Sequence, residues 1–583
     1  MKHFNSNQKI KSGKIIIIIL SAIGIIACIP LLFSQVRLMI MDFVIQIMHK
    51  ENPVYSPEWL VSLLTYAIVG ICFILFFDYC SLTNSGRRLV QNTKQELKDC
   101  LSEIDFRSLR NPVLIMLCVY FLGVLTIIRA HFLYQDDIWW SISGIRGWYD
   151  WSRYIVVFLS YFVQPEIRMT YISPLPLLLA ILILACSSVL LVYILGKGKI
   201  TIVRLLASIP MGLSPFFLEC LSYNFSSPYM ALPIMVSIVP FLFITRKKAF
   251  IFVSVVSLLI MCMTYQAASG IYPMIAAILC FQYWNSREKN NKEIFSFLGM
   301  TAITFCFSML FFRFFLMRPF GIEYASTAAH SVTHLISGTL SNIINYTMTI
   351  YQDFSIIWII GIAIVLFFFI IKSVYKSAQK RIFSFFISIL VIILSFMLSF
   401  GVFSLLAAPI FSPRALMGFG VFLAILCVYV VSDYIKIASF AVLALNWCLF
   451  VFAFSYGNAL ADQARYAEFR VTILLHDLII LYPNENNEDR FIKFQNSIEY
   501  TPSVKNIEKH YPIIGRLVPK RLSHDLWDYT YFLNHFNFLQ FAESSFLNRK
   551  TVFNSWDELP VVFDSYYHTI KSDGEHILIV LKH

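Results

Sequence analysis

Two adjacent acids, Asp136 and Asp137, are the residues of this chain best suited to carry out chemistry. They follow directly after an apolar stretch long enough to cross a membrane, residues 112–130. Carboxylates at the mouth of a membrane helix are costly to remove from water, which favours a functional role. Beside an apolar wall, a carboxylate can act as a general base. Adjacent side chains diverge, so we expect one acid to face a substrate and the other to cap a helix or hold a basic group; we favour Asp137 for the substrate.

A third acid, Glu219, ends the apolar stretch 201–221 and is followed by Tyr223 at helical spacing. Gln266 lies at a comparable turn between the apolar stretches 249–266 and 268–284. These positions make Glu219 a further catalytic candidate and Tyr223 and Gln266 candidates for contact with a substrate. The alternative is that they are ordinary polar residues at a membrane surface.

Three arginines could bind an anionic substrate group. Arg414 lies in Ser412-Pro-Arg-Ala at the start of an apolar stretch, and Arg146 and Arg153 lie in the irregular segment after the acid pair. A guanidinium can hold a phosphate through two parallel hydrogen bonds, so these residues suit a lipid-phosphate substrate. The alternative for each is snorkelling to lipid headgroups.

The segment Trp139–Tyr154 interleaves aromatic and charged residues. It is too irregular to span a membrane and predicts one or two helices lying in the membrane interface. For most of these aromatic side chains, an anchoring belt at headgroup level is the competing interpretation.

The surroundings of these residues are those of a membrane protein. Of the 583 residues, 58% are hydrophobic and only 14% are charged, and the mean hydropathy is +0.70. A soluble chain of this length would need more charges to cover its surface. The fold class expected is mainly α and polytopic, with about thirteen spans, near 14–33, 59–77, 112–130, 173–195, 201–221, 229–245, 249–266, 268–284, 295–315, 354–372, 382–403, 414–432 and 436–456.

The loops between these stretches predict an orientation. Lysine and arginine cluster before the first stretch and in 78–111, 246–248, 287–292 and 372–381, whereas the alternate loops contain few. The positive-inside rule therefore predicts a cytoplasmic N-terminus, with the acid pair and the C-terminal tail outside. The net charge of +12 then largely reflects topology, and no nucleic-acid partner is expected.

Three units are expected along the chain. Residues 1–111 form two N-terminal spans with a basic connector, and residues 112–456 form the catalytic membrane part with an outer loop at 131–172. Composition becomes that of a soluble protein near residue 457, so 457–583 is predicted to be a small outer α/β domain. Asp573-Gly574 between two β-like runs predicts a hairpin in it.

No metal and no cofactor are expected. His330 and His334 are four residues apart but have no third ligand, and no phosphate-binding loop or dinucleotide fingerprint is present.

Four motifs together resemble the serotype-converting O-antigen glucosyltransferases of enteric bacteria and their phages. They are Tyr134-Gln-Asp-Asp137, Phe217-Leu-Glu-Cys-Leu-Ser-Tyr223, Tyr265-Gln-Ala-Ala268 and Phe411-Ser-Pro-Arg414. The tail adds Pro502–Ile507, Tyr511–Pro519 and Tyr566–Ser572, so the resemblance extends from about residue 112 to the end.

This resemblance implies a GT-C-like enzyme of the bacterial inner membrane that acts on its periplasmic face. It implies glucose transfer from undecaprenyl-phosphate glucose to a sugar of lipid-linked O-antigen, a modification of lipopolysaccharide. A flippase and a polyprenyl-phosphate glucosyltransferase would supply the donor, and membrane lipids surround the enzyme. We expect a metal-independent single displacement, in which one acid activates the acceptor hydroxyl and arginines, Arg414 first, stabilise the leaving phosphate. With a sugar substrate implied, Trp139, Trp148, Tyr223 and Gln266 become the expected sugar-binding residues, and the aromatic ones could stack on sugar rings.

Two alternatives stay open at this point. Another GT-C transferase with a different sugar or acceptor would have the same pocket chemistry. A flippase or transporter of lipid-linked sugars would instead place polar residues and broken helices near mid-membrane, often in inverted repeats.

Overall fold

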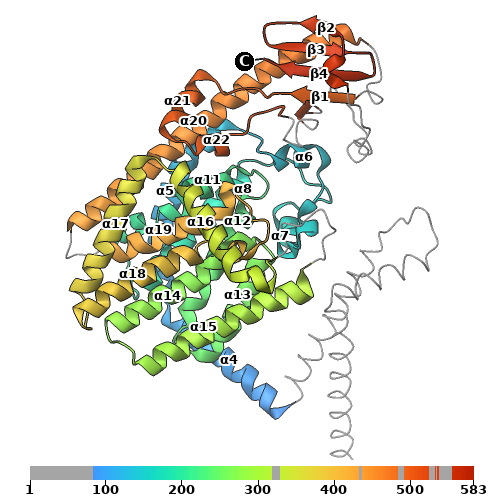
Figure 1. Cartoon of the computed structure of the whole chain (residues 1–583). Coiled ribbons are helices and arrows are strands. Elements are labelled where there is room, and N and C mark those ends of the chain that lie inside the picture. Colours follow the sequence, from blue (N-terminus) through green and yellow to red (C-terminus); the bar gives the residue numbers. More distant parts are fainter. Residues whose placement is uncertain are drawn as a thin grey trace, which may run out of the picture.

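The computed structural model describes residues 83–317, 329–431, 436–483, 491–523, 532–533, 535–536 and 555–582. Within these residues the protein is mainly helical, with a small β-sheet close to the C-terminus, as predicted (Figure 1). The spans expected at 14–33 and 59–77 lie outside the described residues.

Most helices pack side by side into one body. In chain order its elements are α4 (Asn84–Glu103), α5 (Phe106–Ala130), α8 (Leu175–Leu195), α9 (Ile202–Ala207), α10 (Pro210–Leu213), α11 (Pro215–Ser222), α12 (Ser227–Ile238), η3 (Val239–Phe243), α13 (Lys247–Cys262), η4 (Gln266–Gly270), α14 (Ile271–Asn285), α15 (Asn291–Phe311), η5 (Phe312–Leu316), η7 (Val332–His334), α16 (Leu335–Asp353), α17 (Ile356–Tyr375), α18 (Arg381–Leu398), η8 (Gly401–Leu405), η9 (Pro413–Leu416), α19 (Met417–Val430) and α20 (Lys436–Leu481).

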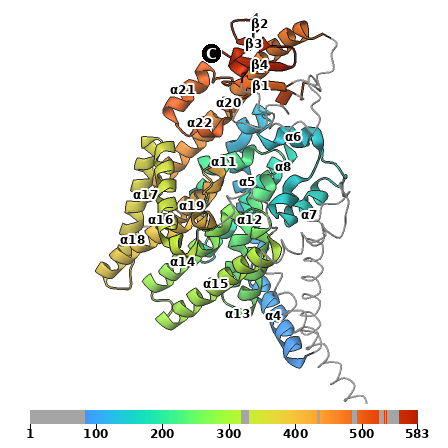
Figure 2. The same cartoon turned by 45° about the vertical axis from the view of Figure 1, so that its right-hand side comes forward.

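Three short helices lie between α5 and α8. They are α6 (Asp136–Ser143), η2 (Gly147–Trp151) and α7 (Tyr154–Val163), and they lie beside the upper part of the helical body (Figure 2). One or two short helices were expected here, and the structure has three; the expectation that the segment does not form a continuous span is confirmed.

Eight helices of the described residues are long and apolar enough to cross a membrane, or nine if one bent pair counts as a span. The thirteen spans expected are therefore not all present as continuous helices. The stretch 201–221 is bent by 63° between Leu213 and Pro215, where the Ser214 hydroxyl accepts the Phe217 N–H and begins a new helix. The span expected at 229–245 is formed by α12 followed by η3, and the span expected at 249–266 is formed by α13. α13, with 16 residues, is shorter than a standard span.

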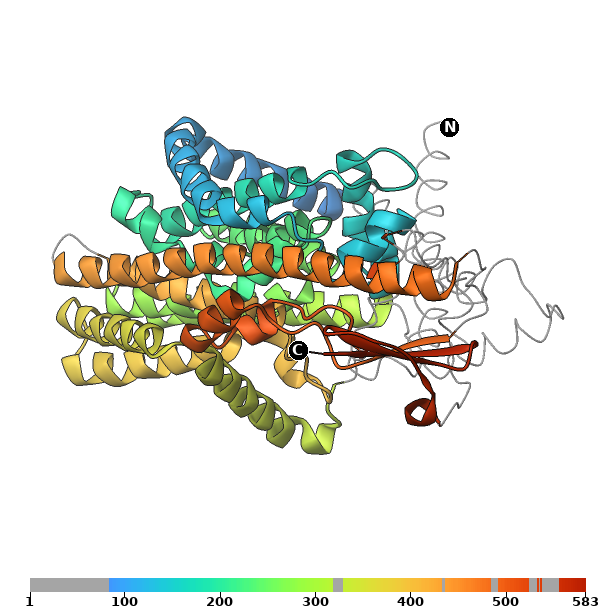
Figure 3. The same cartoon turned by 90° about the horizontal axis from the view of Figure 1, so that it is seen from above.

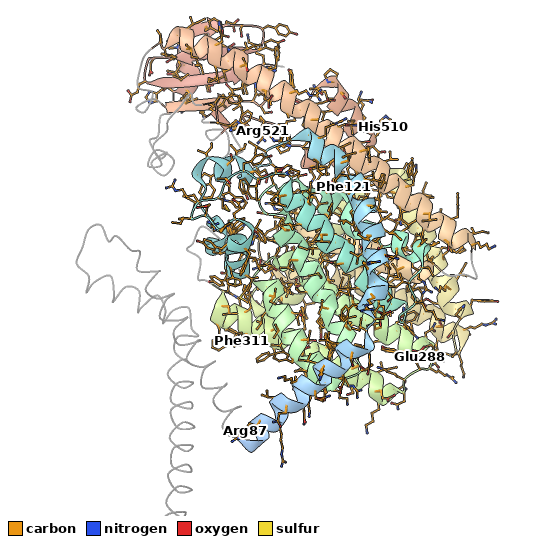
Figure 4. All side chains as sticks on the ribbon, turned by 180° about the vertical axis from the view of Figure 1, so that it is seen from behind. Arg87, Phe121, Glu288, Phe311, His510 and Arg521 are labelled. Atoms are coloured by element: carbon orange, nitrogen blue, oxygen red, sulfur yellow. The ribbon has the colours of Figure 1, made fainter. Side chains whose placement is uncertain are left out.

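The basic loops gather at one end of the body. Lys197 forms an ion pair with Glu288, Arg287 donates to Gln379 over 3.3 Å, and Arg246 lies 3.5 Å from Glu103 of α4. Figure 4 shows Arg87 and Glu288 at this end and Arg521 toward the opposite one. This clustering is the arrangement that the positive-inside pattern requires.

The sheet lies at the other end. β1 (Phe491–Gln495), β2 (Val561–Asp564), β3 (His568–Ser572) and β4 (His576–Leu581) form four strands in the order β1-β4-β3-β2, with β1 parallel to β4 and the other pairs antiparallel. The predicted hairpin is β3–β4, and Gly574 turns it at a φ of +102°. The remaining tail elements are α21 (Pro502–His510), α22 (Ile514–Leu517) and η11 (Trp556–Glu558). We call this end of the molecule the sheet end.

α20 packs against both the helical body and the sheet. Its 46 residues pass straight through the boundary expected between 456 and 457, and seen from above it runs along the body toward the sheet (Figure 3). Composition changes there, but the backbone does not. Gly457 marks close packing and not a linker, since a Cβ on it would lie 2.3 Å from the Thr126 hydroxyl of α5.

One glycine contact near the sheet end supports a stability prediction. A Cβ on Gly270 would lie 1.8 Å from the backbone oxygen of Leu398, so Gly270→Ala forces α18 and η4 apart. We expect a loss of about 1–3 kcal/mol or more, seen as a lower unfolding temperature in detergent. Gly299→Ala in α15 is the matched control, because no atom lies within 4 Å of the added methyl. Equal unfolding temperatures of the two variants would contradict the prediction.

Candidate active site

The acid pair lies on a strained turn at the sheet end. α5 ends at His131, whose φ of 49° is left-handed, and Gln135 just before α6 has a φ of 38°. Residues other than glycine adopt positive φ only rarely, and such strain gathers at functional sites. The turn sends α6 away from the axis of α5 and directs the side chains of Gln135 and Asp137 toward α11 and α12.

Asp137 is fully buried and ties this turn to the start of α12. Its carboxylate accepts the N–H of Tyr134 (3.2 Å) and of Phe225 (3.3 Å), and both the backbone N–H (2.8 Å) and the side-chain amide (3.0 Å) of Asn224. Four donors satisfy the carboxylate. The geometry therefore gives Asp137 the bracing role that we expected of one member of the pair.

Burial raises the pKa of Asp137 to about 7, although the four N–H donors oppose part of this effect. An exposed aspartate has a pKa of about 3.9, so between roughly pH 4 and 7 the folded state holds a proton that the unfolded state releases. The free energy of unfolding should therefore fall as pH rises through this window, by at most about 1.4 kcal/mol per pH unit. Unfolding temperatures from pH 4 to 8 measure the slope, and Asp137→Asn should flatten it. An unchanged slope in that variant would contradict this assignment.

Asp136 is the more accessible acid. It is partly exposed and interacts electrostatically with Arg153, Tyr223 and Arg414. These residues come from η2–α7, α11 and η9, so Asp136 faces the place where three segments meet. The preference for Asp137 as the acid facing a substrate is not supported by this geometry, which favours Asp136.

Glu219 and Arg414 form a pair between α11 and η9. Arg414 donates from Nη1 to Oε1 of Glu219 over 2.8 Å and from its backbone N–H to Oε2 over 2.5 Å. Glu219 is 1% exposed, whereas the side chain of Arg414 is 26% exposed. Both carboxylate oxygens are therefore engaged, which favours a role for Glu219 in positioning Arg414 over direct contact with a substrate.

Gln135 and Tyr223 complete the polar cluster. The Tyr223 hydroxyl donates to Oε1 of Gln135 over 2.7 Å, and Arg414 Nη1 reaches the same oxygen at 3.3 Å and also contacts the hydroxyl. Tyr223 is buried, with its ring edge-on to Tyr134 at 4.9 Å. Tyr223 thus lies in the site as predicted, but with its hydroxyl already bonded.

Arg153 is a cation of the cluster with an unused donor. Its guanidinium lies over the Tyr265 ring, 4.9 Å from the centroid, and the charge of Asp136 acts on it. Its Nε is buried without a hydrogen-bond partner. A buried N–H without a partner is costly, so an anionic ligand at this position would satisfy it.

Arg146 is engaged elsewhere. It donates to the backbone oxygens of Ile167 (2.5 Å) and Gln164 (2.6 Å) and to the Ser160 hydroxyl (2.9 Å), and it stacks on Tyr161. These contacts brace the segment around α7 and leave Arg146 out of the polar cluster.

The two tryptophans predicted to bind sugar differ in how accessible they are. Trp148 is 2% exposed, packs between Trp140 and Tyr229 and donates to Ser226, so its faces are covered. Trp139 is partly exposed beside it.

Gln266 donates to the Cys262 oxygen over 2.8 Å within its own turn, next to Tyr265. Gln266 therefore lies next to the cluster, because its neighbour Tyr265 contacts Arg153.

Sequence reasoning missed three residues that build the cluster. Gln135 precedes the acid pair directly, and that adjacency was the available signal. Tyr265 stood within a recognised motif but was not chosen. Asn224 followed Tyr223, and nothing in the sequence showed that its amide would hold Asp137 across 87 residues.

The chain is similar to known proteins over the part that contains the polar cluster. The sequence model of the family described as "Glucosyl transferase GtrII" matches residues 125–425, which include every residue of the polar cluster. An uncharacterized 55.3 kDa protein from the gtrB 5′ region of Salmonella phage P22 is 24% identical over 417 residues, 68% of this chain and 84% of that protein. No solved structure matches. The family predicted from the motifs is confirmed: the chain belongs to the GtrII glucosyl transferases.

Proposed function

We propose that the protein transfers glucose from a polyprenyl-phosphate glucose, undecaprenyl-phosphate glucose in bacteria, to a hydroxyl of lipid-linked O-antigen on the periplasmic face of the inner membrane. One observation carries this proposal. The partly exposed Asp136 lies in one cluster with two cations, Arg153 and Arg414, at the end of the helices opposite the basic loops.

The arrangement suits a single displacement. Asp136 accepts the proton of the acceptor hydroxyl while the oxygen of that hydroxyl bonds to the anomeric carbon of glucose. The bond from that carbon to the phosphate oxygen breaks, and the configuration at the carbon inverts. Both electrons of the broken bond leave with the polyprenyl phosphate.

The two arginines stabilise this leaving phosphate. Arg153 is the first choice, because its Nε is buried without a hydrogen-bond partner. Arg414 is already paired with Glu219, so it contributes an oriented donor with a partly neutralised charge. A phosphate monoester leaving group carries less charge than a nucleoside diphosphate, so two arginines can replace a metal ion.

The test uses the purified chain in liposomes with a lipid-linked O-antigen acceptor. Labelled polyprenyl-phosphate glucose should transfer its label to the glycan, also when EDTA is present. Labelled UDP-glucose should not. Transfer from the nucleotide sugar, or complete loss of transfer with EDTA, would overturn the proposal. Polyprenyl-phosphate mannose in a parallel reaction distinguishes a transferase for another sugar.

A further inference from the structure

Part of the tail belongs to the same core as the membrane helices. Ile513, Ile514 and Leu517, in and next to α22, are completely buried in the apolar cluster that fills the helical body. Tyr511 stacks on Trp358 of α17 at 5.3 Å. α22 therefore lies on the sheet end of the body as a packed element (Figure 2).

Arg516 of α22 holds the segment that leads to Arg414. One nitrogen of its guanidinium forms an ion pair with Asp353 at the end of α16, and the other donates to the backbone oxygen of Phe411. Asp353 is 4% exposed, and its backbone oxygen also accepts the N–H of Ile513 over 3.3 Å. Phe411 stands three residues before Arg414, so this contact fixes the start of the turn that presents the cation.

The next residue, Leu517, contacts the other turn of the site, which carries Gln135 and Asp136. The backbone oxygen of Leu517 accepts the hydroxyl of Tyr134 over 2.8 Å, and Tyr134 directly precedes Gln135. The Tyr456 hydroxyl approaches the same oxygen at 3.5 Å and lies 2.8 Å from Ser222, near the end of the helix that carries Glu219.

Arg521 adds a second contact to this turn. It donates to the backbone oxygen of Leu133, and its guanidinium lies over the Phe132 ring at 4.5 Å. Figure 4 shows Arg521 between the tail and the top of α5. Three residues of the tail, Arg516, Leu517 and Arg521, therefore contact the two turns that carry the polar cluster.

We infer that Arg516, Leu517 and Arg521 of the tail form a clamp that sets the separation of the Gln135–Asp136 turn and the Arg414 turn, and that Arg516 is its principal positioning residue. The inference rests on the proposed function and extends it to a part of the chain beyond the range of the family match, 125–425. Transfer requires the base and the phosphate-binding cations at a fixed separation, and an error of about 1 Å can lower a rate by about 10²-fold.

Arg516→Ala tests the clamp, and Lys520→Ala is its matched control. Lys520 lies four residues away and pairs with Glu499 inside the tail, so it touches neither turn. We expect Arg516→Ala to lower kcat by about 10–100-fold with a much smaller change in the KM for the lipid donor. Lys520→Ala should keep the wild-type kcat. Arg516→Lys should recover part of the loss, since one ammonium group keeps the charge but cannot hold both partners.

Backbone hydrogen exchange separates positioning from general destabilisation. In Arg516→Ala, exchange should rise in 411–416, with α8 and α14 unchanged. Exchange that stays at the wild-type level in 411–416 would overturn the inference, as would an equal rise throughout the helices. The measurement needs no substrate, so it tests the clamp independently of whether the wild-type chain transfers glucose.

Tyr134→Phe keeps the inference testable if Arg516→Ala fails to fold. It removes only the hydroxyl that donates to Leu517 and should raise exchange in 132–137 with a smaller loss of kcat. If both contacts belong to one clamp, the double variant should lose less than the product of the two single losses. Losses that multiply fully, or no rise in exchange in 132–137, would show that the two contacts act separately and reject the clamp.

Discussion

Asp136→Asn is expected to lower the rate of glucose transfer by about 10²–10⁴-fold, because asparagine cannot accept the proton of the acceptor hydroxyl. Binding of the lipid donor should change little, since the arginines that meet its phosphate remain. The measurement is kcat with labelled polyprenyl-phosphate glucose, together with the unfolding temperature. We expect the unfolding temperature to stay close to the wild-type value, because Asp136 is partly exposed.

Asp137→Asn is the informative comparison for this experiment. Asparagine keeps one acceptor oxygen, but its NH2 group would face at least one existing N–H donor, that of Phe225 if the oxygen takes the Oδ2 position, so we expect a lower unfolding temperature as well as lower activity. Full activity of Asp136→Asn would remove this residue from the mechanism. Inactivity of Asp137→Asn at an unchanged unfolding temperature would return the role of base to Asp137.

Glu219→Gln is expected to cause the second large effect. It leaves the charge of Arg414 without its partner, and breaking a buried pair in this way costs about 3–5 kcal/mol. Arg414 keeps some access to water, which places the expected loss near the lower end of that range. Transfer should also nearly disappear, because Arg414 loses the contacts that orient it. Unfolding temperature and kcat measure the two effects separately.

The double variant Glu219→Gln, Arg414→Met separates the role of the charge from that of packing. It removes both charges, so stability should recover while transfer stays low. Recovery of transfer in the double variant would mean that neither residue takes part in the reaction. A single variant Glu219→Gln with normal stability would mean that the pair is not a tightly coupled one.

The sequence was sufficient to predict the class of fold and the end of the helices at which the site lies. Apolar stretches and basic loops predicted the membrane helices and their grouping, and Asp573-Gly574 predicted the β3–β4 hairpin. These features depend on local composition and spacing. The bend after Leu213 was harder to foresee, because a Ser-Pro pair within an apolar run suits a broken helix and a continuous one alike.

The pairing of residues within the site could not be predicted in the same way. Arg414 and Glu219 are 195 residues apart, and only the packing of η9 against α11 brings them together. Asp137 is buried whereas Asp136 is partly exposed, and this difference depends on the positive φ of Gln135. Glutamine is not a residue type that indicates such a turn. Trp148 lies in a segment rich in aromatic residues, which suggested that it could stack on a sugar ring. The aromatic residues around it instead form a packed core that covers it.

The unbroken course of α20 gives the molecule a fixed length scale. At 1.5 Å per residue, its 46 residues extend about 69 Å, and the hydrocarbon core of a bilayer takes up about 30 Å of that length. The remainder packs against the sheet, with Val471, Leu474 and Leu478 in one core with Phe494 and Ile577. Motion of the sheet relative to the helical body must then break this core or bend the helix.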